Sequence, residues 1–174
     1  MRAVGEVMSI GKTYKEAFQK AIRSLENGRY GLGFAKNFHA RPLPELLQML
    51  NEPSSERQFI LYEALRKGAE IDDLYKRTHV KPWFLRQMKE LVELEGKILR
   101  YKGKDLPDDL LVQAKKDAFA DRYLAMLIGC GEALQGAEAE AAETAFHARA
   151  AARLQIRKVV PDHPVIRIEC HAHL

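Results

Sequence analysis

The chain has 174 residues, with 28 Lys and Arg against 24 Asp and Glu, and a formal net charge of +4. This length suits one domain, and a hydrophobic share of 47% excludes a disordered chain. The charges are interspersed, which indicates solvated helix faces rather than a nucleic-acid footprint. With no apolar run of transmembrane length and no signal-peptide pattern, we expect a cytoplasmic protein with neither a membrane nor a nucleic acid as partner.

The first element expected is a β-strand in "AVGEVMSI", residues 3–10, which Gly11 ends. A strand has N–H and C=O groups that need a partner, and even an isolated hairpin is marginal in water. The rest of the sequence offers no sheet that could close within the chain. We therefore expect a frayed strand, or a severed strand whose sheet lies in protein outside this chain.

An amphipathic helix is predicted directly behind this strand. Thr13 and Glu16 form a T-x-x-E capping box, and apolar residues follow at helical spacing, namely Tyr14, Phe18, Ala21, Ile22 and Leu25. The next stretch, "RYGLGFAKNFHARP", has glycines that follow a helix rather than a strand. Because it also lacks the GxGxxG and GK[ST] patterns, we interpret it as a helix-terminating loop and not as a phosphate site.

Further helices, most of them short, are predicted as far as residue 153. They are predicted in "PLPELLQMLN", "SSERQFILYEALRKG" and "EIDDLYKRT", over a longer stretch from about Pro82 to about Arg100, from near Pro107, from Asp121, and in the alanine-rich residues 136–153. Residues 165–174 are expected to be extended. The fold class is therefore all-α: an irregular bundle of short helices with a severed N-terminal strand and an extended C-terminal tail.

Two features of the central helices could carry function. The stretch "EIDDLYKRTHVKPWFLRQMKEL" resembles a DNA-binding helix-turn-helix, but Trp83, Phe84 and Leu85 would occupy the base-reading positions. Such large apolar side chains are better explained as core or interface anchors. Glu95 interrupts an apolar stripe, so its carboxylate must be paired, hydrogen-bonded or protonated. We expect a structural, paired carboxylate rather than a catalytic acid.

The cysteines and histidines give no clear site. The tail "PDHPVIRIECHAHL" gathers His163, Cys170, His171 and His173, but a structural zinc ion needs four ligands in tetrahedral geometry, which a tail supplies poorly. Cys130 lies beside glycines, and the sequence places no base or positive charge near it. We therefore expect neither a native metal site nor a catalytic nucleophile.

Three segments resemble one family in the correct order. "AVGEVMSIGKTYKEAFQKAIRSLE", "ALRKGAEIDDLYKRTHVKPWFLRQMKELVELE" and "AKKDAFADRYLAML" are similar to the oligomerisation or connection domain of the carbamoyl-phosphate synthetase large subunit. The resemblance runs from residue 1 to about residue 129. This chain departs from the family pattern where "GF" becomes Ala118-Phe119, where Lys81-Pro82 replaces an acid before "WFL", and in the C-terminal tail.

The resemblance implies a non-catalytic segment between two ATP-grasp halves that make carbamoyl phosphate from bicarbonate and glutamine-derived ammonia. The resemblance also implies that residues 1–11 end an ATP-grasp domain, that residues 12–160 form the helical domain and that residues 161–174 form a linker. Met1 and Glu6 would then line the carbamate tunnel. ATP, Mg²⁺ and K⁺ would bind on the absent ATP-grasp domains and not here. Expected partners are further copies, the flanking ATP-grasp domains and the glutaminase small subunit. A helix-turn-helix module and a degenerate stand-alone adaptor remain the alternatives.

Overall fold

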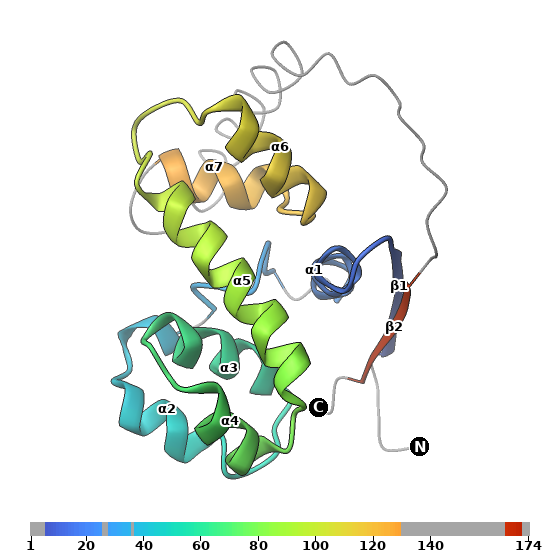
Figure 1. Ribbon diagram of the computed structural model, residues 1–174, viewed down its shortest axis with the longest axis vertical. Coiled ribbons are helices and arrows are strands. Elements are labelled where there is room, and N and C mark those ends of the chain that lie inside the picture. Colours follow the sequence, from blue (N-terminus) through green and yellow to red (C-terminus); the bar gives the residue numbers. More distant parts are fainter. Residues whose placement is uncertain (1–5, 26–27, 36, 130–165, 172–174) are drawn as a thin grey trace.

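The computed structural model describes residues 6–25, 28–35, 37–129 and 166–171. Helices dominate these residues, as the all-α prediction requires, and two short strands complete them (Figure 1). The elements are β1 (Glu6–Gly11), α1 (Tyr14–Ser24), the 3₁₀ turn η1 (Phe38–Ala40), α2 (Leu43–Met49), α3 (Arg57–Arg66), α4 (Ile71–Thr78), α5 (Pro82–Leu99), α6 (Asp108–Lys116), α7 (Asp121–Gly129) and β2 (Ile166–His171). The predicted helix in residues 136–153 lies outside the described residues.

The N-terminal strand has a partner within the chain. β1 pairs with β2 in an antiparallel two-stranded sheet, with Val7 opposite Cys170 and Ile10 opposite Arg167. The N-terminal strand was expected to be frayed or to have its sheet outside the chain, and the pairing with β2 corrects this expectation. The prediction of an extended C-terminal segment is confirmed over β2. A pairing between segments this far apart leaves no local signal in the sequence, because backbone groups form the bonds.

Helix α1 covers one face of the small sheet. It contacts both strands and also α5, so it lies between the sheet and the longest helix (Figure 1). Its start follows the predicted cap, because the Thr13 side chain accepts a hydrogen bond from the backbone N–H of Glu16 at 3.2 Å. The Glu16 carboxylate accepts from the N–H of Lys12 at 2.7 Å, one residue before the position that the capping box predicts.

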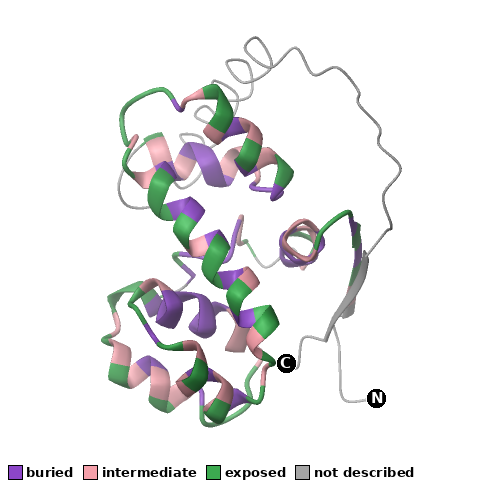
Figure 2. Cartoon of the chain, viewed as in Figure 1, coloured by how far each residue is buried: buried purple, intermediate pink, exposed green. Residues whose placement is uncertain are grey.

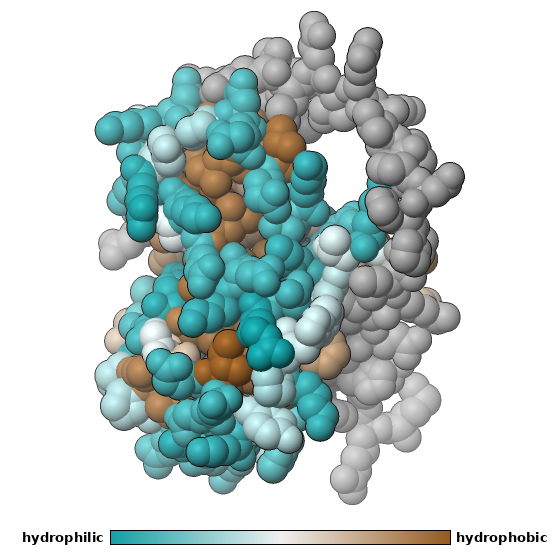
Figure 3. Space-filling view, viewed as in Figure 1, coloured by the Kyte–Doolittle hydropathy of each residue, from teal (hydrophilic) through white to brown (hydrophobic). Residues whose placement is uncertain are grey.

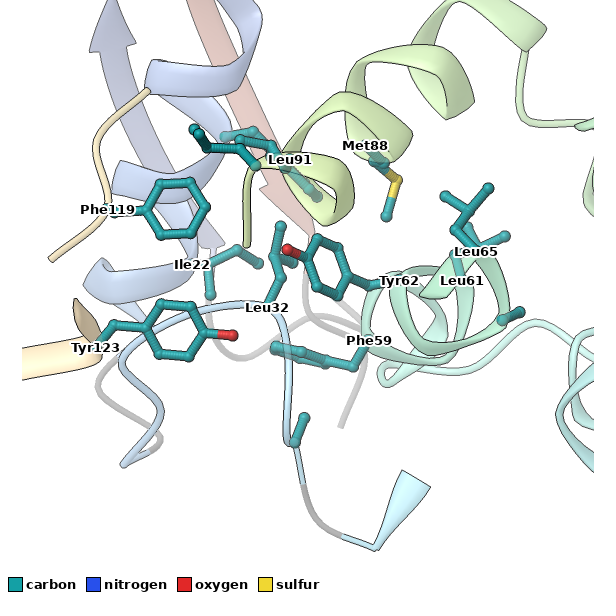
Figure 4. Packing of buried hydrophobic residues seen from close by; sticks show 14 of the residues in the cluster. Ile22, Leu32, Phe59, Leu61, Tyr62, Leu65, Met88, Leu91, Phe119 and Tyr123 are labelled. Atoms are coloured by element: carbon teal, nitrogen blue, oxygen red, sulfur yellow. The ribbon is translucent and has the colours of Figure 1, made fainter. Parts of the chain in front are cut away.

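Helix α5 connects the two ends of the bundle. It contacts α3, α4 and α7, with α4 nearer its start and α7 nearer its end (Figure 1). One stripe of α5 is buried, while exposed residues recur along its other side (Figure 2). The buried stripe joins side chains from α1, α3 and α7 in one core, as the close-up of Ile22, Tyr62, Met88, Leu91 and Tyr123 shows (Figure 4). The exterior over these elements is mostly hydrophilic in this view (Figure 3).

Helices α3 and α6 end in the same hydrogen-bond pattern. At α3, the N–H of Gly68 donates to Leu65 O at 3.0 Å, and the N–H of Ala69 donates to Ala64 O at 2.9 Å. At α6, the N–H of Ala118 donates to Lys115 O at 3.0 Å, and the N–H of Phe119 donates to Ala114 O at 2.9 Å. Both ends are Schellman motifs, which need a left-handed residue. Gly68 has φ +85° and Ala118 has φ +62°, so α6 uses a residue that is strained there.

Candidate association surface and the buried cluster behind it

The three consecutive residues predicted as anchors separate into surface and core. Leu85 is fully buried, whereas Trp83 is 48% exposed and Phe84 is 39% exposed. Pro82 suits the first position of α5, and the helix it starts places these three side chains in its first turn. Leu85 therefore belongs to the core, and Trp83 and Phe84 form part of the surface.

Tyr14 of α1 completes an aromatic patch with Trp83 and Phe84. The ring centroids are 5.4 Å apart for Tyr14 and Trp83, 5.1 Å for Tyr14 and Phe84, and 5.0 Å for Trp83 and Phe84. Phe18, one turn further along α1, stacks under Tyr14 at 5.3 Å. Edge-to-face contacts at these distances are favourable and hold large rings in fixed positions. Sequence reasoning missed Tyr14 as a surface residue, because its spacing only indicated the apolar side of α1.

Behind this surface, the second half of α5 carries a buried carboxylate. Glu95 is 1% exposed. Its Oε2 accepts hydrogen bonds from the hydroxyl of Tyr62 on α3 at 2.9 Å and from that of Tyr123 on α7 at 2.5 Å. Its Oε1 accepts from the guanidinium of Arg66 on α3. Figure 4 shows the two tyrosines entering the core from these helices. Glu95 thus links three helices through charge-assisted hydrogen bonds.

The loop between α1 and η1 closes the same cluster. The N–H of Phe34 donates to Oε1 of Glu63, a second fully buried carboxylate, at 2.8 Å. The Phe34 ring lies under the Arg66 guanidinium, 4.1 Å from its central carbon. A Cβ at Gly33 would come within 2.9 Å of Glu95 Oε2 and 2.5 Å of the Tyr123 hydroxyl. Gly33, which the sequence analysis interpreted as part of a helix-terminating loop, therefore allows the loop backbone to pack closely against this cluster.

Burial decides the protonation behaviour of this cluster. It raises the pKa of the Glu95 carboxyl despite the nearby Arg66 guanidinium and the two tyrosine hydroxyls. Burial, reinforced by the charge of Glu95, also raises the pKa of Tyr62 and Tyr123 well above the usual value, so both hydroxyls stay protonated and donate. For Arg66, burial acts to lower the pKa, but the combined attraction of Glu95, Tyr123, Glu63 and Tyr62 outweighs it, and the pKa is raised. The cluster thus joins a carboxylate, a guanidinium and two hydroxyls in one buried hydrogen-bond network.

Sequence reasoning singled out Glu95 but none of its partners. Arg66 and Tyr62 precede it by 29 and 33 residues, and Tyr123 follows it by 28, so helical spacing could not connect them. Two signals were present: an arginine in the last turn of α3, and a run in α3 in which tyrosine and glutamate stand among apolar residues. A run that is buried on every side must pair its polar groups internally.

The remaining predicted residues are only partly covered by the structure. Met1, Cys130, His163 and His173 lie outside the described residues, and Glu6 begins β1 with only its backbone described. In the part of the chain that is described, no three His, Cys, Asp or Glu side chains gather as metal ligands would. Over the same residues, no helix is both long and apolar enough to cross a membrane.

Comparisons with known proteins agree on one family. The family model for "Carbamoyl-phosphate synthetase large chain, oligomerisation domain" matches residues 6–143. The carbamoyl phosphate synthase large chain of Archaeoglobus fulgidus is 39% identical over 136 residues, which cover 76% of this chain and 13% of that protein. The "large chain, N-terminal section" of Aquifex aeolicus is 40% identical over 132 residues, covering 76% of this chain and 23% of the relative.

A plant relative extends the same pattern. The arginine-specific large chain of Arabidopsis thaliana, named as chloroplastic, is 38% identical over 126 residues, or 72% of this chain and 11% of that protein. The chain therefore spans only a small part of the curated relatives it matches, between 11% and 23% of the three described here. Both the matched residues and the helical architecture agree with the earlier resemblance, and the chain belongs to the family of carbamoyl-phosphate synthetase large-chain oligomerisation domains.

Proposed function

We propose that this chain is a non-catalytic domain that associates with further copies of itself within a carbamoyl-phosphate synthase. The family match over residues 6–143 carries the proposal. The exposed pair Trp83 and Phe84 supports it, because aromatic side chains held rigidly at a surface are typical of interface anchors. Leu85 and the paired Glu95 serve this surface indirectly by fixing α5 in the core.

The proposal extends to the larger protein of which this domain forms part. Its relatives are named carbamoyl phosphate synthase large chain, and one is arginine-specific. We infer ATP-dependent synthesis of carbamoyl phosphate from bicarbonate and glutamine-derived ammonia, for arginine and pyrimidine biosynthesis in the cytoplasm. ATP, Mg²⁺ and K⁺ would bind on flanking ATP-grasp domains, and a glutaminase small subunit would supply ammonia.

Within that larger protein, the three segments of this chain would have different roles. Residues 1–11 would end the preceding ATP-grasp domain, 12–160 would form the association domain, and 161–174 would lead towards a second synthetase half. Met1 and Glu6 would lie on the wall of a carbamate tunnel that exists only when the flanking domains are present. Replacing Glu6 in the complete enzyme should then reduce coupling between carbamate formation in one half and its phosphorylation to carbamoyl phosphate in the other.

Sedimentation velocity over a wide concentration range tests the proposed association. We expect the 174-residue chain to shift from monomer to dimer or a higher oligomer as its concentration rises, and a labelled DNA duplex in the same cell to sediment alone. A monomer at every concentration would contradict self-association. DNA that sediments with the protein at physiological salt would favour the helix-turn-helix alternative, because binding through net charge alone is weak and steeply salt-dependent.

A second assay tests the absence of catalysis. The purified chain should not hydrolyse ATP in the presence of bicarbonate, since the proposal places the nucleotide sites on other domains. Bicarbonate-dependent ATP hydrolysis that survives repeated purification would contradict a non-catalytic role.

A further inference from the structure

A hollow on the surface lies between β1 and the second half of α1, the helix that covers one face of the small sheet (Figure 1). It is open to solvent and has a volume of about 510 Å³. Sites for ligands typically have volumes of about 300–1,000 Å³. The described residues that line the hollow are Met8, Ser9, Ile10, Lys20, Arg23 and Ser24. It is therefore large enough to receive a short stretch of polypeptide.

The backbone of β1 is directed into this hollow at Ile10. The carbonyl oxygen of Ile10 accepts a hydrogen bond from the ammonium of Lys20 on α1 at 3.1 Å. The N–H and C=O groups of one strand residue point to the same edge, and those of the next residue point to the opposite edge. The N–H of Ile10 therefore lies on the side of the hollow, whereas the backbone groups of Ser9 face β2. In the described part of the chain, the sheet has no further strand on the side of the hollow.

An edge strand of this kind can accept one more strand. Backbone N–H and C=O groups at a sheet edge are a template for pairing, and extended peptides bind to other proteins in this way. β1 contains no proline, and its one charged residue, Glu6, stands at its start, so the strand lacks two common devices that prevent such pairing. The contact from Lys20 occupies one lone pair of Ile10 O and leaves the second.

The two faces of β1 predict the chemistry of the added strand. Met8 and Ile10 are 54% and 57% exposed on the face away from α1, because Ser9 between them is buried and donates to a backbone carbonyl of α1. On the other face, Lys20 and Arg23 border the hollow. Side chains of neighbouring strands interact when they share a face. An added strand should therefore alternate apolar residues, on the exposed apolar face, with acidic residues, beside the two bases.

We propose that an extended segment of another protein, with alternating acidic and apolar residues, binds in this hollow and adds a third strand to the sheet at β1. Lys20 already pairs with Glu16 at 2.7 Å. Arg23 is exposed, and the structure records no hydrogen bond or ion pair from its guanidinium to another described residue. Arg23 therefore contributes most of the attraction for a carboxylate of the segment.

The charges favour this partner over a second copy of the chain. If two β1 strands paired in antiparallel orientation, a two-fold axis perpendicular to the sheet would keep both α1 helices on the same face. The Lys20 and Arg23 side chains of the two copies would then approach each other, and like charges across an interface are unfavourable. An acidic segment is attracted by the same side chains. The inference does not depend on the self-association proposed above.

Peptide binding tests the proposal in the 174-residue chain. The probe is a fluorescein-labelled peptide that alternates glutamate and valine, and fluorescence anisotropy at physiological salt measures its binding. A peptide of the same composition with its glutamates grouped at one end, and a peptide that alternates lysine and valine, should each bind about tenfold more weakly or worse. Arg23→Glu should weaken binding of the probe by about tenfold or more. Lys104→Glu makes the same change of charge between α5 and α6 and should leave binding unchanged.

Hydrogen exchange shows whether the bound probe forms a strand. The amide of Ile10 should exchange about tenfold more slowly or less in the complex, while the amide of Ser9, which faces β2, should change little. Ile10→Pro removes the N–H donor and should abolish binding, with circular dichroism to check that each variant is folded.

Three outcomes would overturn the proposal and leave the proposed self-association standing. They are a wild-type chain that does not bind the probe, a probe that binds Arg23→Glu as well as it binds the wild type, and a probe that binds without protecting the amide of Ile10. Protection of this amide that rises with protein concentration in the absence of the probe would show a second copy at β1, and would likewise overturn it.

Discussion

Replacing Gly68 with alanine should destabilise the chain by about 1 kcal/mol. Gly68 has φ +85°, and a Cβ there meets nothing within 4 Å, so the substitution adds neither a clash nor a contact. The left-handed conformation costs an L-residue about 1–2 kcal/mol. Alanine also reduces the entropy of the unfolded chain, which offsets about 0.4–1 kcal/mol. The net loss corresponds to a fall in Tm of about 2–4 °C for a chain of this size.

Helix α6 provides the reciprocal substitution. Ala118 occupies the position equivalent to Gly68 in the same motif, with φ +62°. Ala118→Gly relieves the same strain and should stabilise the chain by up to about 1 kcal/mol, less a small loss because the buried methyl group is removed. Ala114→Gly, inside α6, controls for glycine itself and should destabilise by about 1 kcal/mol or more.

Urea denaturation followed by circular dichroism measures all three variants. The opposite signs expected for Gly68→Ala and Ala118→Gly make the test sharp, because both act on one backbone conformation at two helix ends. If Gly68→Ala were as stable as the wild type, or if Ala118→Gly lowered stability as much as Ala114→Gly does, the explanation by left-handed strain would be wrong.

Three further predictions concern the cluster, the cap of α1 and the sheet. Tyr123→Phe removes a hydroxyl donor from the buried Glu95 carboxylate and should lower the free energy of unfolding in urea by about 1.5–3 kcal/mol; an unchanged value would contradict the network. Burial opposes the shift, but hydrogen bonds from the Lys20 ammonium and the Lys12 backbone N–H lower the pKa of the Glu16 carboxyl. The stabilisation that Glu16 provides is therefore present above about pH 4.5 and is lost as the pH falls through its folded-state pKa. The urea midpoints of wild type and Glu16→Gln should therefore converge in acid. Val7→Cys should form a disulfide with Cys170 under mild oxidation, detected by thiol titration and peptide mapping, because directly opposed residues of antiparallel strands have Cα atoms within disulfide range.

Local features of the fold could be predicted from the sequence because local rules produce them. The Thr13 cap and the start of α5 at Pro82 depend on neighbouring residues only, and both are confirmed. Glu95 could be singled out because it breaks a 3.6-residue apolar period on a single helix. The end of α3 at Gly68 could be predicted as well, because a glycine directly after a periodic apolar run is a signal for a helix C-terminus.

Features that join distant segments could not be predicted in this way. The partners of Glu95 come from two other helices, and which tyrosines and arginines meet it depends on how those helices pack. The role of Gly33 depends on the approach of Tyr123, 90 positions away in sequence. The partner of β1 is a strand near the other end of the chain, and the hydrogen bonds between them involve backbone groups that every residue possesses. Exposure of Trp83 and Phe84 beside a buried Leu85 likewise follows from tertiary packing.

The pairing of β1 with β2 has a consequence for how such a unit is carried in a longer polypeptide. The strand by which the chain enters the helical bundle and the strand that follows the bundle run side by side, with Glu6 opposite His171. Protein attached before the first strand and protein attached after the second would therefore meet at one place. Neighbouring ends are what allow a domain to be inserted into a host protein without forcing its two parts apart. The pairing of the two strands should also occur late in folding, because it closes a loop that contains every helix of the described chain.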